Sequence, residues 1–178
     1  TLSLSNIIIN KGFGSPLRLF IDLPSEDTIE VINLFNIQQK MIVASSGYKG
    51  FIIPNMESLL AYTKLGKNVL DVSPDEKLVV FKPVSQEDDS IAIIGENHKL
   101  LIFKISEMAL QNKGKGVILQ KAKQGKLTDI QTFVFSEGIT CKRENSTKIF
   151  NDLELWLGKR AQSGRLAPRG FPRSNRFS

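Results

Sequence analysis

Residues 41–53 have the sequence MIVASSGYKGFII, and residues 91–103, fifty positions later, have the sequence IAIIGENHKLLIF. In each stretch a run rich in β-branched residues leads to a short polar segment with Gly47 or Asn97, residue types that accept a positive φ, and then to a second apolar run. The sequence therefore predicts two equivalent β-hairpins within an internal repeat of about fifty residues.

The similarity between the two copies extends past the hairpins. Residues 57–60 and 107–110 are each expected to form a short helical segment, and a turn rich in Gly and Lys follows at 66–70 and at 114–118. Each copy then continues into another strand, at 78–81 and at 130–135. Four short strands in about 40–50 residues are typical of propeller blades, so the sequence predicts an all-β repeat protein.

Two partial copies flank the complete ones. Residues 10–14 repeat the Gly/Lys turn, with strands expected at 17–21 and 29–35, and residues 138–150 are expected to form a last hairpin. The sequence thus predicts two complete units, a unit without its first hairpin, and a unit cut short after its hairpin.

After residue 150 the pattern changes. Asn151 or Asp152 can cap a helix in which Leu153, Trp156 and Leu157 form an apolar stripe, and this helix is expected to end near Gly164. Residues 165–177 contain two prolines and four arginines without a core-forming pattern, so a mobile or surface-draped tail is expected. The predicted division is a β-repeat domain over residues 1–150 and a C-terminal helix with a basic tail over 151–178.

Charge is distributed unevenly along the 178 residues. The formal net charge is +6, but residues 1–90 carry −3 and residues 91–178 carry +9. Residues 111–126 and 158–178 contain no acidic residue, and clustered cations of this kind suit a polyanion such as nucleic acid, although they also occur on ordinary solvated surfaces. The first candidates for such contacts lie in 111–126 and a second group surrounds the last hairpin: Lys113, Lys115, Lys121, Lys123 and Lys126, then Lys142, Arg143 and Lys148. The tail arginines either add nonspecific affinity or only pack, and the sequence leaves both alternatives open.

Several other classes of protein do not fit the sequence. No apolar run approaches the roughly 20 residues of a membrane helix, and the single cysteine, Cys141, excludes an internal disulfide and a cysteine-based zinc site. Tyr48 and Tyr62 fall in a turn and at the end of a short helical segment, so structural roles are expected for both. No catalytic residue, metal site or cofactor is predicted, and the cytoplasm is the expected compartment.

Long stretches of the sequence resemble one family. Residues 116–121, 125–133, 156–166 and 170–175 are similar to the C-terminal domain of the A subunit of bacterial DNA topoisomerase IV, and residues 43–46 and 95–103 agree with it. The resemblance implies a β-pinwheel, a propeller-like ring whose four-stranded blades exchange a strand with the next blade. This length would hold an incomplete ring of about three to four blades.

The resemblance also implies a function. A domain of this family binds and bends duplex DNA on its outer rim without reading sequence, and presents a DNA segment to the catalytic core of a type IIA topoisomerase for decatenation or relaxation. The implied partners are duplex DNA, the rest of the A subunit and the B subunit, in the nucleoid of the cytoplasm and away from membranes. The catalytic tyrosine would lie outside this chain.

The chain departs from the related gyrase A domain at one motif. That domain carries the pattern Gln-Arg-Arg-Gly-Gly-Lys-Gly, whereas residues 111–116 have the sequence QNKGKG, without the arginines and one residue shorter. Wrapping of DNA in the manner of gyrase is therefore not expected. The alternative function is a protein-interaction module without nucleic acid, in which exposed Phe20, Phe51 and Phe171 would matter more than the lysines.

Overall fold

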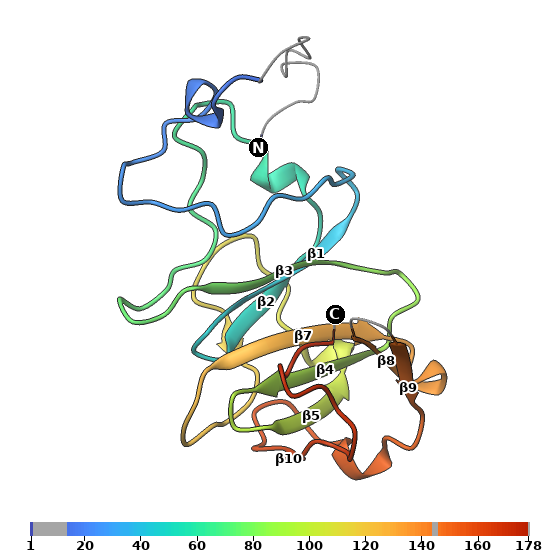
Figure 1. The fold of residues 1–178 in the computed structure, drawn as a ribbon. Coiled ribbons are helices and arrows are strands. Elements are labelled where there is room, and N and C mark those ends of the chain that lie inside the picture. Colours follow the sequence, from blue (N-terminus) through green and yellow to red (C-terminus); the bar gives the residue numbers. More distant parts are fainter. Residues whose placement is uncertain (2–13, 144–145, 178) are drawn as a thin grey trace.

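The computed structural model describes residues 1, 14–143 and 146–177. These residues form two four-stranded antiparallel sheets and a two-stranded hairpin, joined by loops and short 3-10 turns (Figure 1). The all-β prediction is confirmed.

The first sheet has the strand order β3-β1-β2-β6. Strands β1 (Lys40–Ser45) and β2 (Lys49–Ile53) form the predicted first hairpin. Strand β3 (Leu78–Val84) pairs with β1, and the short β6 (Val117–Ile118) pairs with β2 at the opposite edge.

The second sheet has the equivalent order β10-β5-β4-β7. Strands β4 (Ser90–Gly95) and β5 (Lys99–Lys104) form the predicted second hairpin, while β7 (Leu127–Phe133) and β10 (Arg165–Leu166) form its two edges. The last predicted hairpin is also present, as β8 (Ile139–Arg143) and β9 (Ser146–Phe150).

Each four-stranded sheet borrows one edge strand from the following unit. Strand β6 comes after the second hairpin in sequence but completes the first sheet, and β10 comes after the third hairpin but completes the second sheet. The same hydrogen bond follows both borrowed strands: the Leu119 N–H donates to the Tyr48 carbonyl at 2.8 Å, and the Ala167 N–H donates to the His98 carbonyl at 2.8 Å. This is the strand exchange that the family resemblance implies.

The helical segments are single 3-10 turns. Three of them, η3 (Glu57–Leu59), η4 (Ile105–Glu107) and η6 (Glu154–Trp156), follow the three hairpins, whereas η2 (Leu17–Leu19) and η5 (Phe135–Glu137) lie elsewhere. The helix expected from Asn151 or Asp152 to Gly164 is wrong, because the segment forms only η6 and then extends into β10. Within that segment Trp156 does pack, as expected, and its indole N–H donates to the Leu166 carbonyl at 2.7 Å.

The first, partial unit differs from the prediction. The strand expected at 17–21 is replaced by η2, and no strand forms at 29–35. The latter segment is tethered instead, since the Asn33 side-chain amide donates to the Phe81 carbonyl at 2.9 Å. Residues 10–13 of the expected Gly/Lys turn lie outside the described residues.

The hydrophobic core is layered because the central strands are buried on both faces. Along β1, Ile42 and Ala44 pack between the two sheets, while Met41 and Val43 pack on the opposite face under the loops of the first unit. Along β4, Ile91 and Ile93 face the first sheet, and the alternate residues face the third hairpin and the C-terminal segment. Burial on both faces explains why these strands have continuous apolar sequences rather than alternating ones.

The tight turns of the two main hairpins place the positive φ one residue later than expected. Tyr48 has φ 59° and His98 has φ 56°, whereas Gly47 and Asn97 do not have a positive φ. A Cβ at Gly47 would lie 2.2 Å from the Glu76 carboxyl carbon, so a larger residue there would displace that side chain from Ser45 and Lys49.

Gly116 lies where β6 joins β2, and replacing it should destabilise the exchange. It has φ +72°, and a Cβ would lie 2.6–2.8 Å from the backbone of Gly50. We expect Gly116→Ala to lower the free energy of unfolding by about 2–3 kcal/mol through backbone strain and overpacking. Urea denaturation followed by circular dichroism measures this.

Gly66→Ala is the matched control for Gly116→Ala. Gly66 has nearly the same φ of +71°, but nothing lies within 4 Å of the added Cβ. Gly66→Ala should lower the free energy of unfolding by about 1 kcal/mol, because only the strain of a positive φ at alanine contributes. Equal losses at the two glycines would contradict a close approach at β6.

Candidate nucleic-acid interface

The residues from 113 to 126 form the edge of the first sheet and the loop that leads into β7. Three backbone hydrogen bonds fix this segment: Gly114 N–H to the Val69 carbonyl at 3.0 Å, Leu119 N–H to the Tyr48 carbonyl at 2.8 Å, and Lys121 N–H to the Gln162 carbonyl at 3.1 Å. The side chain of Gln120, buried beneath it, donates to the carbonyls of Lys99 and Ser163. The path of the backbone is therefore held on both sides of β6.

The five lysines of this segment project from that fixed backbone. Lys113, Lys115, Lys121, Lys123 and Lys126 are all exposed. Lys126 donates to the Asp75 carbonyl at 3.1 Å, and no other of these ammonium groups has a hydrogen bond or ion pair with a described residue. They are solvated cations held at the edge of a sheet, available to an anion.

Tyr48 supports the C-terminal end of the lysine segment. Its side chain is buried, and its hydroxyl donates to the Lys126 carbonyl at 3.1 Å. Burial, with a smaller contribution from the nearby Glu96 carboxylate, raises the pKa of Tyr48 to about 12. The phenol therefore stays protonated in the folded protein to a higher pH than in the unfolded chain.

This shift in pKa gives the stability a dependence on alkaline pH. Between about pH 10 and pH 12 the unfolded state loses the Tyr48 proton while the folded state keeps it, so the stabilisation is present below pH 10 and is lost as the pH rises through 12. We expect the difference in unfolding free energy between the wild type and Tyr48→Phe to shrink over this range. If the difference in unfolding free energy between the two proteins stays constant from about pH 9 to pH 12, Tyr48 does not have a raised pKa in the folded protein.

The second predicted group lies on the third hairpin. Lys142 on β8 and Lys148 on β9 are exposed, and Arg143 ends β8. The Lys148 ammonium lies 4.6 Å from the centre of the Phe150 ring and donates to the Arg169 carbonyl at 3.3 Å. In Figure 1 this hairpin and the loop before β7 are on opposite sides of the second sheet, so the two predicted groups are not brought together.

The C-terminal segment supplies cations whose role the sequence left open. Its apolar side chains pack, with Phe177 2% exposed and Phe171 against it at a ring-centre distance of 5.5 Å. Its arginines Arg165, Arg169, Arg173 and Arg176 remain exposed. The expectation that this segment contributes nothing to the core is therefore wrong, because Phe177 is buried with Ala167 and Phe171 packed against its cluster, while the arginines remain at the surface.

Arg160 has a structural role instead. Its guanidinium donates to the Glu107 carbonyl at 3.0 Å and to the Ile118 carbonyl at 2.6 Å, and its backbone N–H donates to the Glu107 carboxylate at 2.9 Å. These bonds fasten the turn before β10 to β6 and η4. The basic edges of the two sheets thus adjoin.

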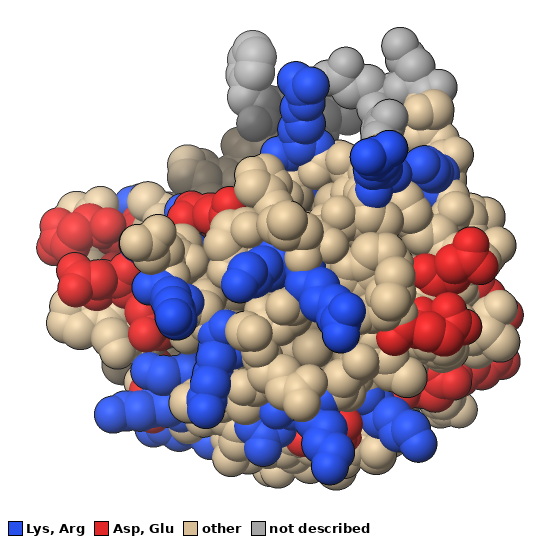
Figure 2. All heavy atoms as spheres, turned by 90° about the horizontal axis from the view of Figure 1, so that it is seen from below, with Lys and Arg blue, Asp and Glu red and all other residues tan. Residues whose placement is uncertain are grey.

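Figure 2 shows the face formed by the lower side of Figure 1, where β5 and β10 lie. Basic side chains are spread over the middle and lower part of this face, and most acidic side chains lie towards its left and right margins. The middle of this face is therefore predominantly basic.

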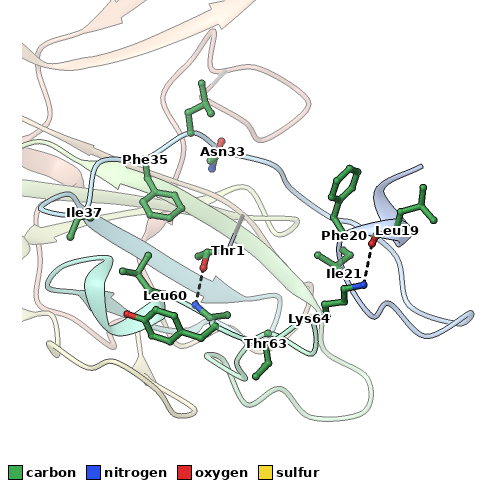
Figure 3. A pocket seen from close by; sticks show the side chains of 14 residues that line it. Thr1, Leu19, Phe20, Ile21, Asn33, Phe35, Ile37, Leu60, Thr63 and Lys64 are labelled. Carbon is green, nitrogen blue, oxygen red and sulfur yellow. Dashed lines mark hydrogen bonds between the residues drawn. The ribbon is translucent and has the colours of Figure 1, made fainter. Parts of the chain in front are cut away.

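One hollow in the described surface is mainly apolar and lies in the first unit. It has a volume of about 840 Å³ and is lined by Thr1 and by residues of 19–21, 33–37 and 60–66 (Figure 3). The Thr1 hydroxyl oxygen accepts a hydrogen bond from the Ala61 N–H at 2.8 Å. Two of the apolar side chains that line the hollow are strongly exposed, Leu34 at 80% and Tyr62 at 91%. Its lining contains no cluster of ionisable groups that would indicate an active site.

The three phenylalanines that were expected to be exposed for protein recognition are buried or half-buried in the structure. Phe51 is fully buried in the first sheet, and Phe20 and Phe171 are half-buried. Phe51 is hidden because both faces of its strand are covered.

Several acidic side chains of the described residues have structural hydrogen-bond partners. No group of three or more His, Cys, Asp and Glu side chains in this part of the chain could hold a metal ion. The carboxylates of Asp88 and Asp89 accept hydrogen bonds from the Ser85 and Phe135 N–H groups, so they cap turns. Within the same residues, no helix is long and apolar enough to cross a membrane.

Comparison with known proteins gives relatives along the whole chain. No family model matches. The chain is 38% identical over 178 residues to the A subunit of DNA topoisomerase 4 from Rickettsia conorii, and 34% identical over 183 residues to that from Caulobacter vibrioides. These alignments cover 100% and 99% of this chain but 24% and 23% of the relatives, so the chain spans about a quarter of their length.

Solved structures share the fold. The structure of the E. coli ParC C-terminal domain superposes with a TM-score of 0.77 over 92% of this chain and 69% of that one, at 22% identity. A DNA gyrase A C-terminal domain superposes with a TM-score of 0.64 over 85% of this chain and 52% of that one, at 15% identity. These likenesses establish the β-pinwheel architecture.

Proposed function

Since this chain belongs to the family of C-terminal domains found in the A subunit of DNA topoisomerase IV, we propose that it binds duplex DNA on its outer rim without reading sequence, and bends it. In this proposal it is a non-catalytic part of a type IIA topoisomerase. It presents a DNA segment to a catalytic core formed by the rest of the A subunit with the B subunit, in the nucleoid of the cytoplasm.

The observation that carries the proposal is the position of the cations along the borrowed strands. Lys115 and Lys121 flank β6, the edge of the first sheet, while Arg165 lies on β10, the edge of the second. The bond from the Lys121 N–H to the Gln162 carbonyl joins the two edges. One phosphate backbone can thus meet a basic edge of each sheet in turn.

The chemistry of these contacts favours positioning over sequence reading. Lysine presents a compact point charge to phosphate, and phosphate contacts fix the position of a duplex without distinguishing bases. The described residues contain no α-helix that could enter a major groove. A duplex that follows two successive edges must curve, and flexible sequences lower the cost of that curvature.

Fluorescence anisotropy with a short mixed-sequence duplex tests the proposal. Between about 50 and 200 mM salt, the logarithm of the affinity should fall linearly with the logarithm of the salt concentration, with a slope of roughly −0.9 per phosphate contact. A second duplex of scrambled sequence should bind equally, and energy transfer between dyes at the duplex ends should rise on binding. Absence of binding at the lowest salt would refute DNA binding by this chain.

The apolar hollow of the first unit supports the alternative, a protein-interaction module. Leu34 and Tyr62, which line it, are more exposed than large apolar side chains usually are. Under this alternative, the chain would not bind duplex DNA even at the lowest salt of the titration, and Leu34→Ser with Tyr62→Ser would abolish binding of the protein partner.

A further inference from the structure

A second hollow lies where the two sheets meet the C-terminal segment. It has a volume of about 650 Å³, and its walls come from the start of β3, the turn between β4 and β5, the start of β7 and residues 173–176. Four cationic side chains line it: Lys77, Lys126, Arg173 and Arg176. The acidic residues lining it are Glu30 and Glu96, so the wall carries a surplus of two positive charges.

The two arginines project from a turn that is fixed on both sides. Pro172, Asn175 and Phe177 are buried, while Arg173 and Arg176 between them are exposed. The Asn175 N–H donates to the Pro172 carbonyl at 3.1 Å, and the Asn175 side-chain oxygen lies 2.8 Å from Nδ1 of His98. Asn175 has φ 53°, an arrangement that asparagine accepts more readily than most residues.

The end of this turn is anchored across the second sheet. The Phe177 N–H donates to the Asp129 carboxylate at 3.0 Å, and the Phe177 carbonyl accepts from the Lys142 N–H at 2.8 Å. The arginines are therefore presented by an ordered element of the fold, although residues 165–177 have no periodic pattern.

The cationic groups differ in whether they are already engaged. Lys126 is bonded to the Asp75 carbonyl, and the Glu96 carboxylate accepts from the Lys126 N–H at 2.9 Å. Neither guanidinium of Arg173 and Arg176 has a hydrogen bond or ion pair within the described part of the chain. Thr128 lines the same hollow with a buried hydroxyl oxygen that has no partner among those residues.

We propose that Arg173 and Arg176, with Lys126 and Lys77, form a phosphate-binding site for the backbone of duplex DNA at the junction of the two sheets. The planar guanidinium donates two parallel hydrogen bonds to a phosphate, which lysine cannot do. Lys126 belongs both to this hollow and to the lysine segment of the first sheet's edge, so the site continues that surface. This inference rests on the proposed DNA binding and adds a second contact region to it.

The test compares two double variants with the wild type in the same salt titration of duplex binding. Arg173→Ala with Arg176→Ala removes the proposed contacts. Lys40→Ala with Lys104→Ala removes the same charge from exposed positions at the other end of the hairpins. Because all four side chains are exposed, both variants should unfold at the wild-type urea midpoint.

The arginine variant should have a salt slope shallower by about 1.8 and an affinity about fiftyfold lower at about 100 mM salt, with the lysine control close to wild type. Arg173→Lys with Arg176→Lys should keep most of the slope. If the wild type binds DNA and the arginine variant behaves like the lysine control, this inference fails while the proposed function stands. If the wild type does not bind, the proposed function itself fails.

Inorganic phosphate distinguishes a DNA site from a site for a small anion. At constant ionic strength, about 10 mM phosphate in place of chloride should leave the difference between the wild type and the arginine variant unchanged, because backbone binding is governed by the total salt. Loss of that difference in phosphate would show a free-anion site, and would overturn the assignment to the DNA backbone.

Discussion

Changing the five lysines Lys113, Lys115, Lys121, Lys123 and Lys126 to glutamine should lower the affinity for duplex DNA by about five-hundredfold at about 100 mM salt. Each phosphate contact releases counterions and is worth roughly one order of magnitude in affinity at that salt concentration, and this loss corresponds to about three of the five lysines touching phosphate. The slope of the salt dependence should become shallower by about 2.7 at the same time. Fluorescence anisotropy measures both quantities.

Two further variants control this experiment. Changing the same five lysines to arginine keeps the charge and should keep the slope. Lys142→Gln with Lys148→Gln removes the two exposed lysines of the third hairpin. This variant should lose less affinity for duplex DNA than the five-lysine variant, because Lys148 already contacts the Phe150 ring and the Arg169 carbonyl. If the five-lysine variant binds duplex DNA with wild-type affinity, the edge of the first sheet is not part of the DNA interface.

Asp129→Ala should produce a large loss of stability, about 2–4 kcal/mol in the free energy of unfolding. Asp129 is 5% exposed, and its carboxylate forms an ion pair with the Lys82 ammonium at 2.6 Å. It also accepts hydrogen bonds from the N–H groups of Ile130 and Phe177. Its removal leaves a buried N–H and a half-exposed ammonium without their partner.

The loss should have a local signature in addition to its size. The Phe177 amide should exchange its hydrogen much faster in Asp129→Ala, because the C-terminal segment is released from the second sheet. Asp152→Ala removes an exposed carboxylate and is expected to change stability by less than about 0.5 kcal/mol. Unchanged protection of Phe177 would show that Asp129 does not hold the segment.

The hairpins and the exposed lysines could be predicted from sequence because their signals are local. The fifty-residue offset placed the two main hairpins, and an unpatterned run of lysines around glycines indicated an exposed segment. Which strand completes which sheet could not be worked out from periodicity, since β6 and β10 are two residues long. That feature followed from the family resemblance.

The corrected predictions depended on contacts between distant parts of the chain. Leu153, Trp156 and Leu157 fit one helical turn, but the chain after η6 is drawn into an extended path by pairing of β10 with β5. Phe177 is held by a hydrogen bond to Asp129, which lies 48 residues earlier in the sequence. The sequence around Phe177 contains no local pattern that predicts this contact. Residues 29–35 have strand-like composition, but a strand forms only where a partner strand is available.

The borrowed edge strands also fix the order in which the sheets can be completed during synthesis. Lys49 pairs with Ile118, and Lys99 pairs with Leu166. After β2 or β5 has been synthesised, more than sixty further residues must therefore be added before the strand that completes its sheet is available. At a translation rate of about 5–20 residues per second, the free edge of β2 stays open for several seconds, and an open edge is a template for wrong pairing between chains. The sheets are therefore completed from the N-terminus towards the C-terminus, and each receives its last strand from the part of the chain that follows the next hairpin.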